Sequence, residues 1–135
     1  MVLGKNIEQQ IIGTQKIRKL SSIGRNPPIK EIVDANLVPQ LVEFLHSNNE
    51  NLQFEAAWAI TNILSGQCRE IDEFVINLGV VPIFINLLSS KHDDVQEQAV
   101  WALGNIAANN PGLLLDHGIL TPLLEYAFFI HIIIP

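Results

Sequence analysis

The sequence predicts an all-α solenoid in which helical units of one kind stack along an axis. Two observations support this prediction. The segment QFEAAWAITNIL at positions 53–64 returns as QEQAVWALGNIA at positions 96–107, so that Trp58 and Trp101 are 43 residues apart. Within each copy the apolar residues recur at three- and four-residue spacings, which is the periodicity of one helix face. A repeat of this length is typical of stacked helical units.

The same shift organises most of the chain into units of three helices. It carries LVPQLVEFL at positions 37–45 onto VVPIFINLL at positions 80–88, and an incomplete copy begins with GILTPLLEY at positions 118–126. The predicted divisions are an N-terminal tail at 1–6, the end of a first repeat at 7–24, a second repeat at 28–66, a third at 69–109, the start of a fourth at 111–126 and an apolar C-terminal tail at 127–135.

Prolines mark where several of these helices are expected to begin. Proline loses no hydrogen bond in the first turn of a helix, where the backbone N–H has no intrahelical partner. These residues are Pro28 and Pro111 for the first helix of a unit, and Pro39, Pro82 and Pro122 for the second. In the middle unit, residues 70–78 take the place of the first helix.

Left-handed residues are expected between the first and second helices. Gly79 and Gly118 stand at this point, and Asn36 occupies the equivalent place in the earlier unit. Glycine and, less often, asparagine adopt the left-handed conformation that ends a helix. Each unit therefore reads as three helices joined by tight turns.

The third helix of each unit carries a polar and aromatic stripe opposite its apolar one. Asn62 follows Trp58 by four residues, and Asn105 follows Trp101 in the same way. A lone tryptophan on a helix is more often a core residue, but its return beside the same asparagine favours an exposed binding stripe. On the apolar side, small residues are expected to let neighbouring helices approach closely. They are Ala56, Ala57, Ala99, Ala102 and Gly104.

A stripe of this kind suits an extended Lys/Arg-rich peptide. An indole ring stacks on the stem of a lysine and attracts its ammonium group, at roughly 0.5–2 kcal/mol per contact. An asparagine offers both a donor and an acceptor to a peptide backbone. Helices stack roughly 8–10 Å apart and an extended peptide advances about 3.3 Å per residue, so successive tryptophans would meet side chains about three residues apart.

The charge distribution favours the same class of partner. Residues 1–30 hold six Lys or Arg and one acid, whereas residues 31–135 hold two Lys or Arg and thirteen acids. A strongly acidic surface repels phosphate backbones and attracts cationic polypeptides, so nucleic acid is not expected as a partner. Acidity of this kind also serves solubility alone. The basic cluster Lys16, Arg18 and Lys19 is expected to be a solvated helix face.

The sequence offers no chemistry for an enzyme. It contains no phosphate-binding glycine loop, no nucleophile elbow and no HExxH or CxxC pairing, so no catalysis, cofactor or metal is expected. No uncharged apolar run reaches the roughly 20 residues of a membrane span. The single cysteine, Cys68, suits a reducing compartment and is interpreted as an inert thiol. The adjacent acids Asp72 and Glu73, and Asp93 and Asp94, are interpreted as solvated.

These segments resemble a known family. FEAAWAITNILSG at positions 54–66 and VQEQAVWALGNIA at positions 95–107 resemble the early armadillo repeats of importin alpha, and IGTQKIRKLSSIGRNPPIKEIV at 12–33 is similar to the end of its first repeat and the start of the next. The resemblance implies an armadillo-repeat superhelical solenoid of about two and a half repeats. It also implies a nuclear import adaptor, in cytoplasm and nucleus, that binds basic nuclear localisation signals of cargo proteins in an acidic groove.

The resemblance further implies which residues bind the signal. Asn109 stands where the family usually has an acid, and alignment places Ile71 where a threonine commonly lines the same lysine pocket, so this pocket is expected to be weakened. Importin beta is not expected as a partner, because the family's binding segment for it is missing ahead of the first repeat. The implied peptide-binding residues are Trp58, Asn62, Ser65, Gly66, Gln98, Trp101, Asn105 and Asn109.

Two other functions remain open. One is an armadillo scaffold of the cell-adhesion or signalling kind, which binds partners other than localisation signals; the repeated tryptophan and asparagine argue against it. The other is a truncated importin-alpha-like product with little transport activity. The apolar tail at 127–135 and the missing family segments are compatible with that alternative.

Overall fold

The chain is all-helical wherever its structure is described. The computed structural model describes residues 4–65, 68–109, 111–119 and 121–125, and these contain helices and turns but no strand. The last part, residues 121–125, is also helical. In chain order the named helices are α1 (Ile7–Leu20), α2 (Ile29–Asp34), α3 (Val38–Phe44), α4 (Glu50–Leu64), α5 (Arg69–Asn77), α6 (Val80–Leu87), α7 (Asp93–Asn109) and α8 (Pro111–Asp116).

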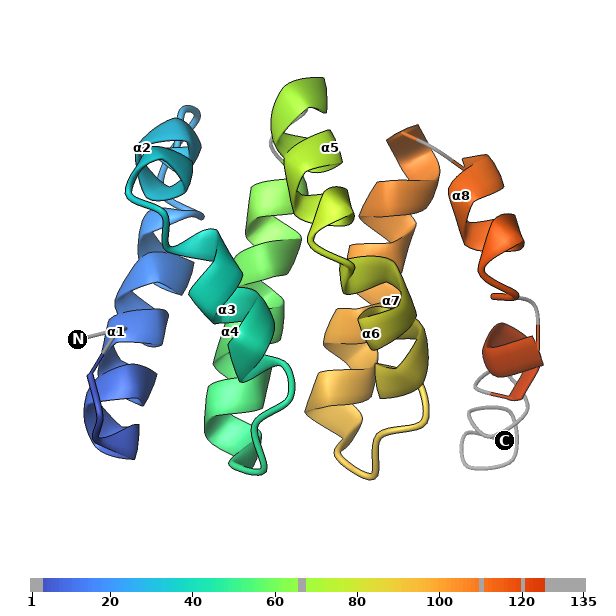
Figure 1. Ribbon diagram of the computed structural model, residues 1–135, viewed down its shortest axis with the longest axis horizontal. Helices are drawn as coiled ribbons and strands as arrows, with labels where there is room; N and C mark the ends of the chain where they lie inside the picture. The colour runs from blue at the N-terminus through green and yellow to red at the C-terminus, as the bar shows by residue number, and fades with distance from the viewer. Residues whose placement is uncertain (1–3, 66–67, 110, 120, 126–135) are drawn as a thin grey trace.

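The helices repeat in groups of three. The long helices α1, α4 and α7 lie side by side, α3 and α6 lie across their near side, and α2, α5 and α8 lie at their upper end (Figure 1). Helix α4 packs against both α1 and α7. Helix α3 packs on α4, and helix α6 packs on α7. Two complete units, α2–α4 and α5–α7, therefore stand between the last helix of one unit and the start of another. The predicted solenoid is confirmed.

The left-handed residues expected between first and second helices are confirmed by the backbone. Asn36, Gly79 and Gly118 have φ values of 58°, 86° and 68°, which places all three in the left-handed region. Helix α2 begins directly after Pro28 and α8 begins at Pro111. The turns that separate first and second helices therefore have the same conformation in each unit.

A repeated side-chain hydrogen bond joins the second helix of each unit to the third. Gln53 Nε2 donates to the carbonyl oxygen of Leu45 at 2.8 Å, and Gln96 Nε2 donates to that of Leu88 at 2.9 Å. The last carbonyls of a helix have no intrahelical partner, so these glutamines satisfy groups that the turn would otherwise leave exposed. Both members of the bond follow the 43-residue repeat.

Small side chains bring the third helices together. Ala56, Ala57, Ala99 and Ala102 are all fully buried, as the sequence predicts. The expectation for Gly104 is wrong, because this residue is exposed and a Cβ placed on it would meet no atom within 4 Å. Gly104 faces away from the packed side of α7 and contributes nothing to the close approach.

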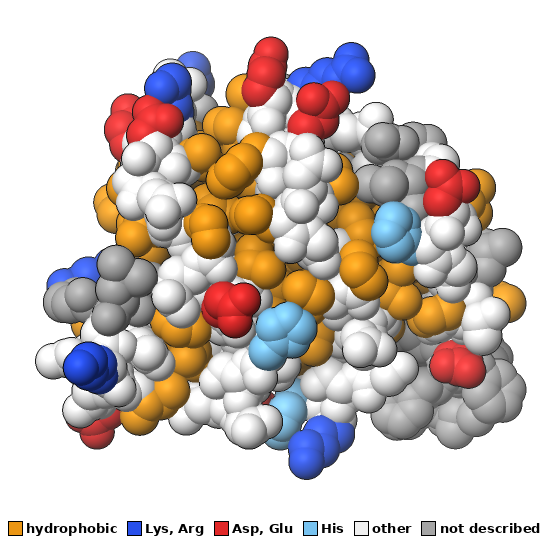
Figure 2. Space-filling model, in the orientation of Figure 1, with side chains coloured by type: hydrophobic (Ala, Val, Ile, Leu, Met, Phe, Trp, Pro, Cys, Tyr) orange, Lys and Arg blue, Asp and Glu red, His pale blue; other side chains and the backbone are white. Residues whose placement is uncertain are grey.

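Hydrophobic side chains fill the spaces between the helices. The fully buried ones include Leu41, Ile60, Val80 and Phe84, which come from α3, α4 and α6. On the face that carries α3 and α6, most charged side chains lie toward the edges and hydrophobic ones lie between the helices (Figure 2). None of the described helices is long and apolar enough to cross a membrane.

Alanine at two glycines is expected to have opposite effects on stability. Gly79→Ala forces a side chain into left-handed backbone, which costs roughly 1–2 kcal/mol. Gly104→Ala removes a flexible residue from a helix interior without a clash and should add about 0.5–1 kcal/mol. Urea unfolding followed by circular dichroism measures both variants. Equal destabilisation by the two would contradict the different backbone conformations assigned to them.

Candidate functional site

The repeated tryptophans and asparagines lie at equivalent positions on neighbouring third helices. Trp58 and Asn62 belong to α4, and Trp101 and Asn105 belong to α7. We call these four residues the Trp/Asn face. Trp101 is 62% exposed to solvent, whereas Trp58 is half-buried. Trp101 is therefore not a core residue, and its exposure requires another explanation.

Trp58 already holds a cation that comes from the chain itself. Arg18 Cζ lies 4.1 Å from the centroid of the Trp58 ring, and Arg18 Nε donates to Glu55 Oε2 at 2.8 Å. A second guanidinium nitrogen, Nη2, lies 3.2 Å from Glu55 Oε1. Only 18% of the Arg18 side chain is exposed, so the expectation that it is solvated is wrong. Lys16 and Lys19 are exposed, as expected.

The Trp/Asn pattern does not extend onto α1. One repeat before Trp58 the chain has Gln15, and one repeat before Asn62 it has Lys19. Gln15 Nε2 donates to Glu55 Oε1 at 3.2 Å and thus joins the same cluster as Arg18. The sequence carried one signal for this cluster: Glu55 stands among alanines on a packed helix, and a buried carboxylate requires a charged or hydrogen-bonding partner.

The asparagines connect successive third helices. Asn62 Nδ2 donates to the carbonyl oxygen of Arg18 and to Ser21 Oγ, both at 3.2 Å. Asn105 Nδ2 donates to the carbonyl oxygen of Thr61 at 3.1 Å. Thr61 lies one repeat after Arg18, so the bond repeats with the structure. The amide oxygen of each asparagine is the acceptor that these bonds leave for a peptide N–H.

A buried carboxylate lies beside Asn109. Asn109 Nδ2 donates to Asp72 Oδ2 at 2.7 Å, and Asp72, which is 5% exposed, has no hydrogen-bond partner for Oδ1. Burial raises the pKa of Asp72, while the bond from Asn109 works in the opposite direction. Ile71 instead packs against the hydrophobic core. The expectation that Asp72 is solvated is therefore wrong, whereas Glu73 is exposed as expected.

A second buried acceptor, on α7, also lacks a partner. Gln98 Oε1 on α7 is buried and accepts no hydrogen bond. Buried acceptors without donors are rare in proteins, so each points to a donor from outside the chain or to an ordered water. Ser65 is exposed at the end of α4 and donates to the carbonyl oxygen of Asn62 at 2.7 Å. Gly66 lies outside the described residues.

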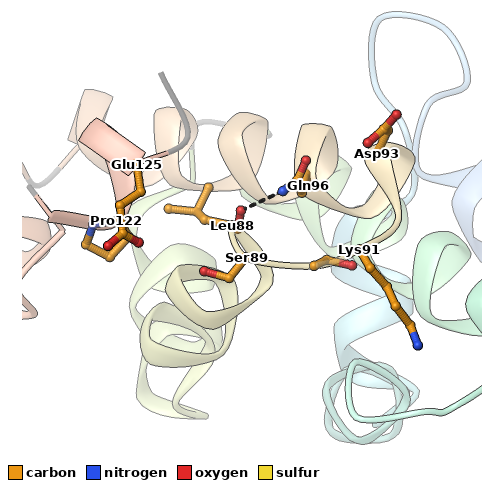
Figure 3. A pocket seen from close by; sticks show the side chains of 8 residues that line it. Leu88, Ser89, Lys91, Asp93, Gln96, Pro122 and Glu125 are labelled. Atoms are coloured by element: carbon orange, nitrogen blue, oxygen red, sulfur yellow. Dashed lines mark hydrogen bonds between the residues drawn. The ribbon is translucent and has the colours of Figure 1, made fainter. Parts of the chain in front are cut away.

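The hollows on the described helices include two of about 450 Å³ or more. One, of about 570 Å³, adjoins Asn62 and Ser65 and is lined on its other side by Ser21, Ser22 and Arg25. It therefore continues the Trp/Asn face toward the end of α1. The other, of about 450 Å³, lies between the α6–α7 turn and residues 122 and 125 (Figure 3), and none of the sequence-predicted binding residues lines it.

Metal-binding clusters are not found on the part of the chain that is described. No three His, Cys, Asp or Glu residues lie close enough there to hold a metal ion. Cys68 is a free thiol at the start of α5. In the described part of this face, Trp101 is the exposed aromatic ring, and Gln98, three residues before it on α7, carries a buried acceptor without a partner.

The repeat geometry and this face define an armadillo protein. The family model for the armadillo/beta-catenin-like repeat matches residues 25–65 and 69–108, and the chain belongs to this family. Two designed armadillo repeat proteins have similar structures. One has a TM-score of 0.84 at 27% identity and covers 92% of this chain and 52% of its own. The other, solved in complex with the peptide (KR)4, has a TM-score of 0.81 at 31% identity, over 91% and 52%.

Within this family the chain is importin-alpha-like. Importin subunit alpha-1 of Schizosaccharomyces pombe is 50% identical over 65 residues, which are 48% of this chain and 12% of that protein. Importin subunit alpha-2 of Arabidopsis thaliana is 57% identical over 58 residues, which are 42% of this chain and 11% of that protein. The match thus spans a small part of each relative's length.

Proposed function

We propose that this chain binds extended Lys/Arg-rich segments, as in nuclear localisation signals, across the Trp/Asn face, and that it acts as a nuclear import adaptor without catalysing a reaction. The cytoplasm and nucleus are the corresponding compartments. Peptide contacts are assigned to the Trp/Asn face together with Ser65, Gly66, Gln98 and Asn109. To these we add Asp72, because its carboxylate lies against Asn109.

The contact between Arg18 and Trp58 carries this proposal. It is an arginine stacked 4.1 Å above a tryptophan of the repeat, with a carboxylate at its edge. Trp101 is the equivalent ring one repeat later; it is 62% exposed, and no cation of the described residues stacks on it. A peptide cation on Trp101 would therefore reproduce a geometry that the fold already supports at the preceding position.

The unsatisfied acceptors support a donor-rich ligand. A lysine side chain carries three N–H donors, and an arginine side chain carries five. Asp72 Oδ1 and Gln98 Oε1 both lack donors, and Asn105 keeps its amide oxygen available for a peptide N–H. The similar designed protein that holds (KR)4 supports a basic peptide as the ligand of this architecture.

Titration calorimetry with (KR)4 tests the proposal. We expect saturable binding that weakens at least about threefold as salt rises from about 50 to about 500 mM, because screening reduces the attraction between peptide cations and acidic residues. The control is a peptide of the same length in which glutamine replaces every Lys and Arg. The glutamine peptide should not bind.

The same titration separates the alternatives. Equal binding of both peptides, or binding of (KR)4 that salt leaves unchanged, would contradict recognition of cations. Failure of the folded chain to bind either peptide would favour an armadillo scaffold with other partners or a product without transport activity. Circular dichroism on the same sample establishes that the chain is folded.

A further inference from the structure

The α1 side of Trp58 has the composition of a guanidinium site. The indole ring covers one face of the Arg18 guanidinium, and both oxygens of Glu55 accept hydrogen bonds along its edge, at 2.8 and 3.2 Å. The Glu55 side chain is 8% exposed, so it is a largely desolvated carboxylate. An aromatic face combined with a buried carboxylate is the arrangement that recognises arginine in a ligand.

We propose that Arg18 fills this site in place of a peptide arginine and so closes the Trp/Asn face at Trp58. A peptide cation that approaches the α1 side of Trp58 has to displace Arg18 from both the ring and Glu55. Only the side of the face that continues toward Trp101 is then open to a cation. The competition with peptide rests on the proposed function, whereas the cation site itself does not.

The repeat itself indicates that Arg18 has a special role. The positions equivalent to Arg18 are Thr61 on α4 and Gly104 on α7, neither of which reaches a tryptophan with a charge. The backbone carbonyls of Arg18 and Thr61 accept equivalent asparagine bonds, so the backbone position is shared. The three positions therefore differ in the long cationic side chain of Arg18. Because α7 stacks on α4 without such a side chain, stacking of the helices does not depend on it.

The charge beside this site also opposes a basic peptide. Lys19 is exposed on the same helix, and Arg25 lines the hollow beyond Asn62 and Ser65. Like charges at close range disfavour a second cation there. In contrast, the buried acceptors without a partner, Asp72 Oδ1 and Gln98 Oε1, belong to α5 and α7. The two sides of Trp58 therefore differ in the charge that they favour.

Removal of Arg18 tests the inference with two probes. Arg18→Thr installs the residue of the equivalent position on α4, and Lys19→Thr removes the same charge from the same helix without touching Trp58. We expect Arg18→Thr to tighten binding of (KR)4 by about two- to thirtyfold, the range of one added cation–aromatic contact. Lys19→Thr should raise the affinity for (KR)4 only through the loss of a repelling charge, so its gain should disappear at high salt.

The second probe does not require peptide binding. N-acetyl-arginine amide carries one guanidinium, and N-acetyl-citrulline amide is its neutral isostere. The chain has two tryptophans, so in a Trp101→Phe background the emission reports Trp58 alone. At constant ionic strength, the arginine derivative should change this emission saturably when Arg18 is threonine and not when Arg18 is present. The citrulline derivative should have no effect, and Glu55→Gln should abolish the response.

The outcomes separate the inference from the proposed function. A response to the arginine derivative without peptide binding would support the cation site and count against the proposed function. Unchanged or weaker peptide binding by folded Arg18→Thr would overturn the competition, as would an equal, salt-resistant gain from Lys19→Thr. If Arg18→Thr does not fold, Arg18→Gln keeps a donor to Glu55 without a charge, and the same expectations apply to it.

Discussion

Trp101→Ala is expected to weaken binding of (KR)4 by about thirtyfold while leaving the stability of the fold unchanged. The ring is 62% exposed and makes no ring contact with another described aromatic residue, so its removal costs little packing. A desolvated cation–aromatic contact is worth about 2 kcal/mol, and residues that dominate an interface reach this value. Calorimetry gives the affinity and thermal unfolding gives the stability.

Two variants act as controls for Trp101. Trp101→Phe keeps an aromatic face and should lose only part of the affinity. Leu115→Ala truncates another exposed hydrophobic residue, 58% exposed, at a place that the account does not assign to peptide binding. Its affinity should equal that of the unaltered chain. A loss in Leu115→Ala as large as that in Trp101→Ala would mean that the Trp/Asn face is not the specific site.

Asp72→Asn is expected to weaken binding of a lysine-bearing peptide by about ten- to a hundredfold and to stabilise the free protein. A charge-assisted hydrogen bond contributes about 1.5–3 kcal/mol, and the variant would lose it. In the free protein the same carboxylate is 5% exposed with one oxygen unpaired, so its charge is unfavourable there. Opposite signs for stability and affinity are typical of residues kept for function.

The pH dependence gives this prediction a second readout. Burial raises the pKa of Asp72 above its ordinary value, so the folded state binds the proton more tightly than the unfolded state. The contribution of Asp72 to the free energy of unfolding should therefore increase as the pH falls from the raised pKa of the folded state toward the ordinary pKa of the unfolded state. Asp72→Asn should lack this contribution. A pH profile identical in both proteins would contradict an ionised, desolvated Asp72.

The position of Asp72 also changes the expectation for Asn109. An aspartate at position 109 matches the usual residue of importin alpha, but here it would stand against the Asp72 carboxylate, which Asn109 contacts at 2.7 Å. Two carboxylates this close cannot both ionise without a cation between them. We infer that the acid expected at position 109 from the resemblance is supplied here by Asp72 on α5.

Much of the fold was predictable because it depends on local chemistry repeated at a fixed interval. Gly79, Gly118 and Asn36 specify left-handed turns by their own conformational preferences, and Gln53 and Gln96 repeat with the helices that they join. Gly104 was misread because small size alone does not indicate which side of a helix a residue occupies. That depends on the helix phase, which is set by packing.

The contacts between units were harder to predict. Arg18 and Glu55 are far apart in sequence and come from different repeats, so their pairing depends on how α1 stacks against α4. Asp72 was misread because an acid at the start of a helix usually faces water, where it complements the helix dipole. Here Asn109, the last residue of the long α7 helix, donates a hydrogen bond to the Asp72 carboxylate on α5.

The indole N–H resonances of the two tryptophans report whether a basic peptide lies on the Trp/Asn face. In a ¹⁵N-edited spectrum of the unaltered chain, titration with (KR)4 should shift both signals saturably at one peptide concentration. The Trp101 signal should move further, because Arg18 covers one side of Trp58. The glutamine peptide should move neither. If (KR)4 binds while both indole signals remain in place, the peptide site lies elsewhere and the account of the Trp/Asn face is wrong.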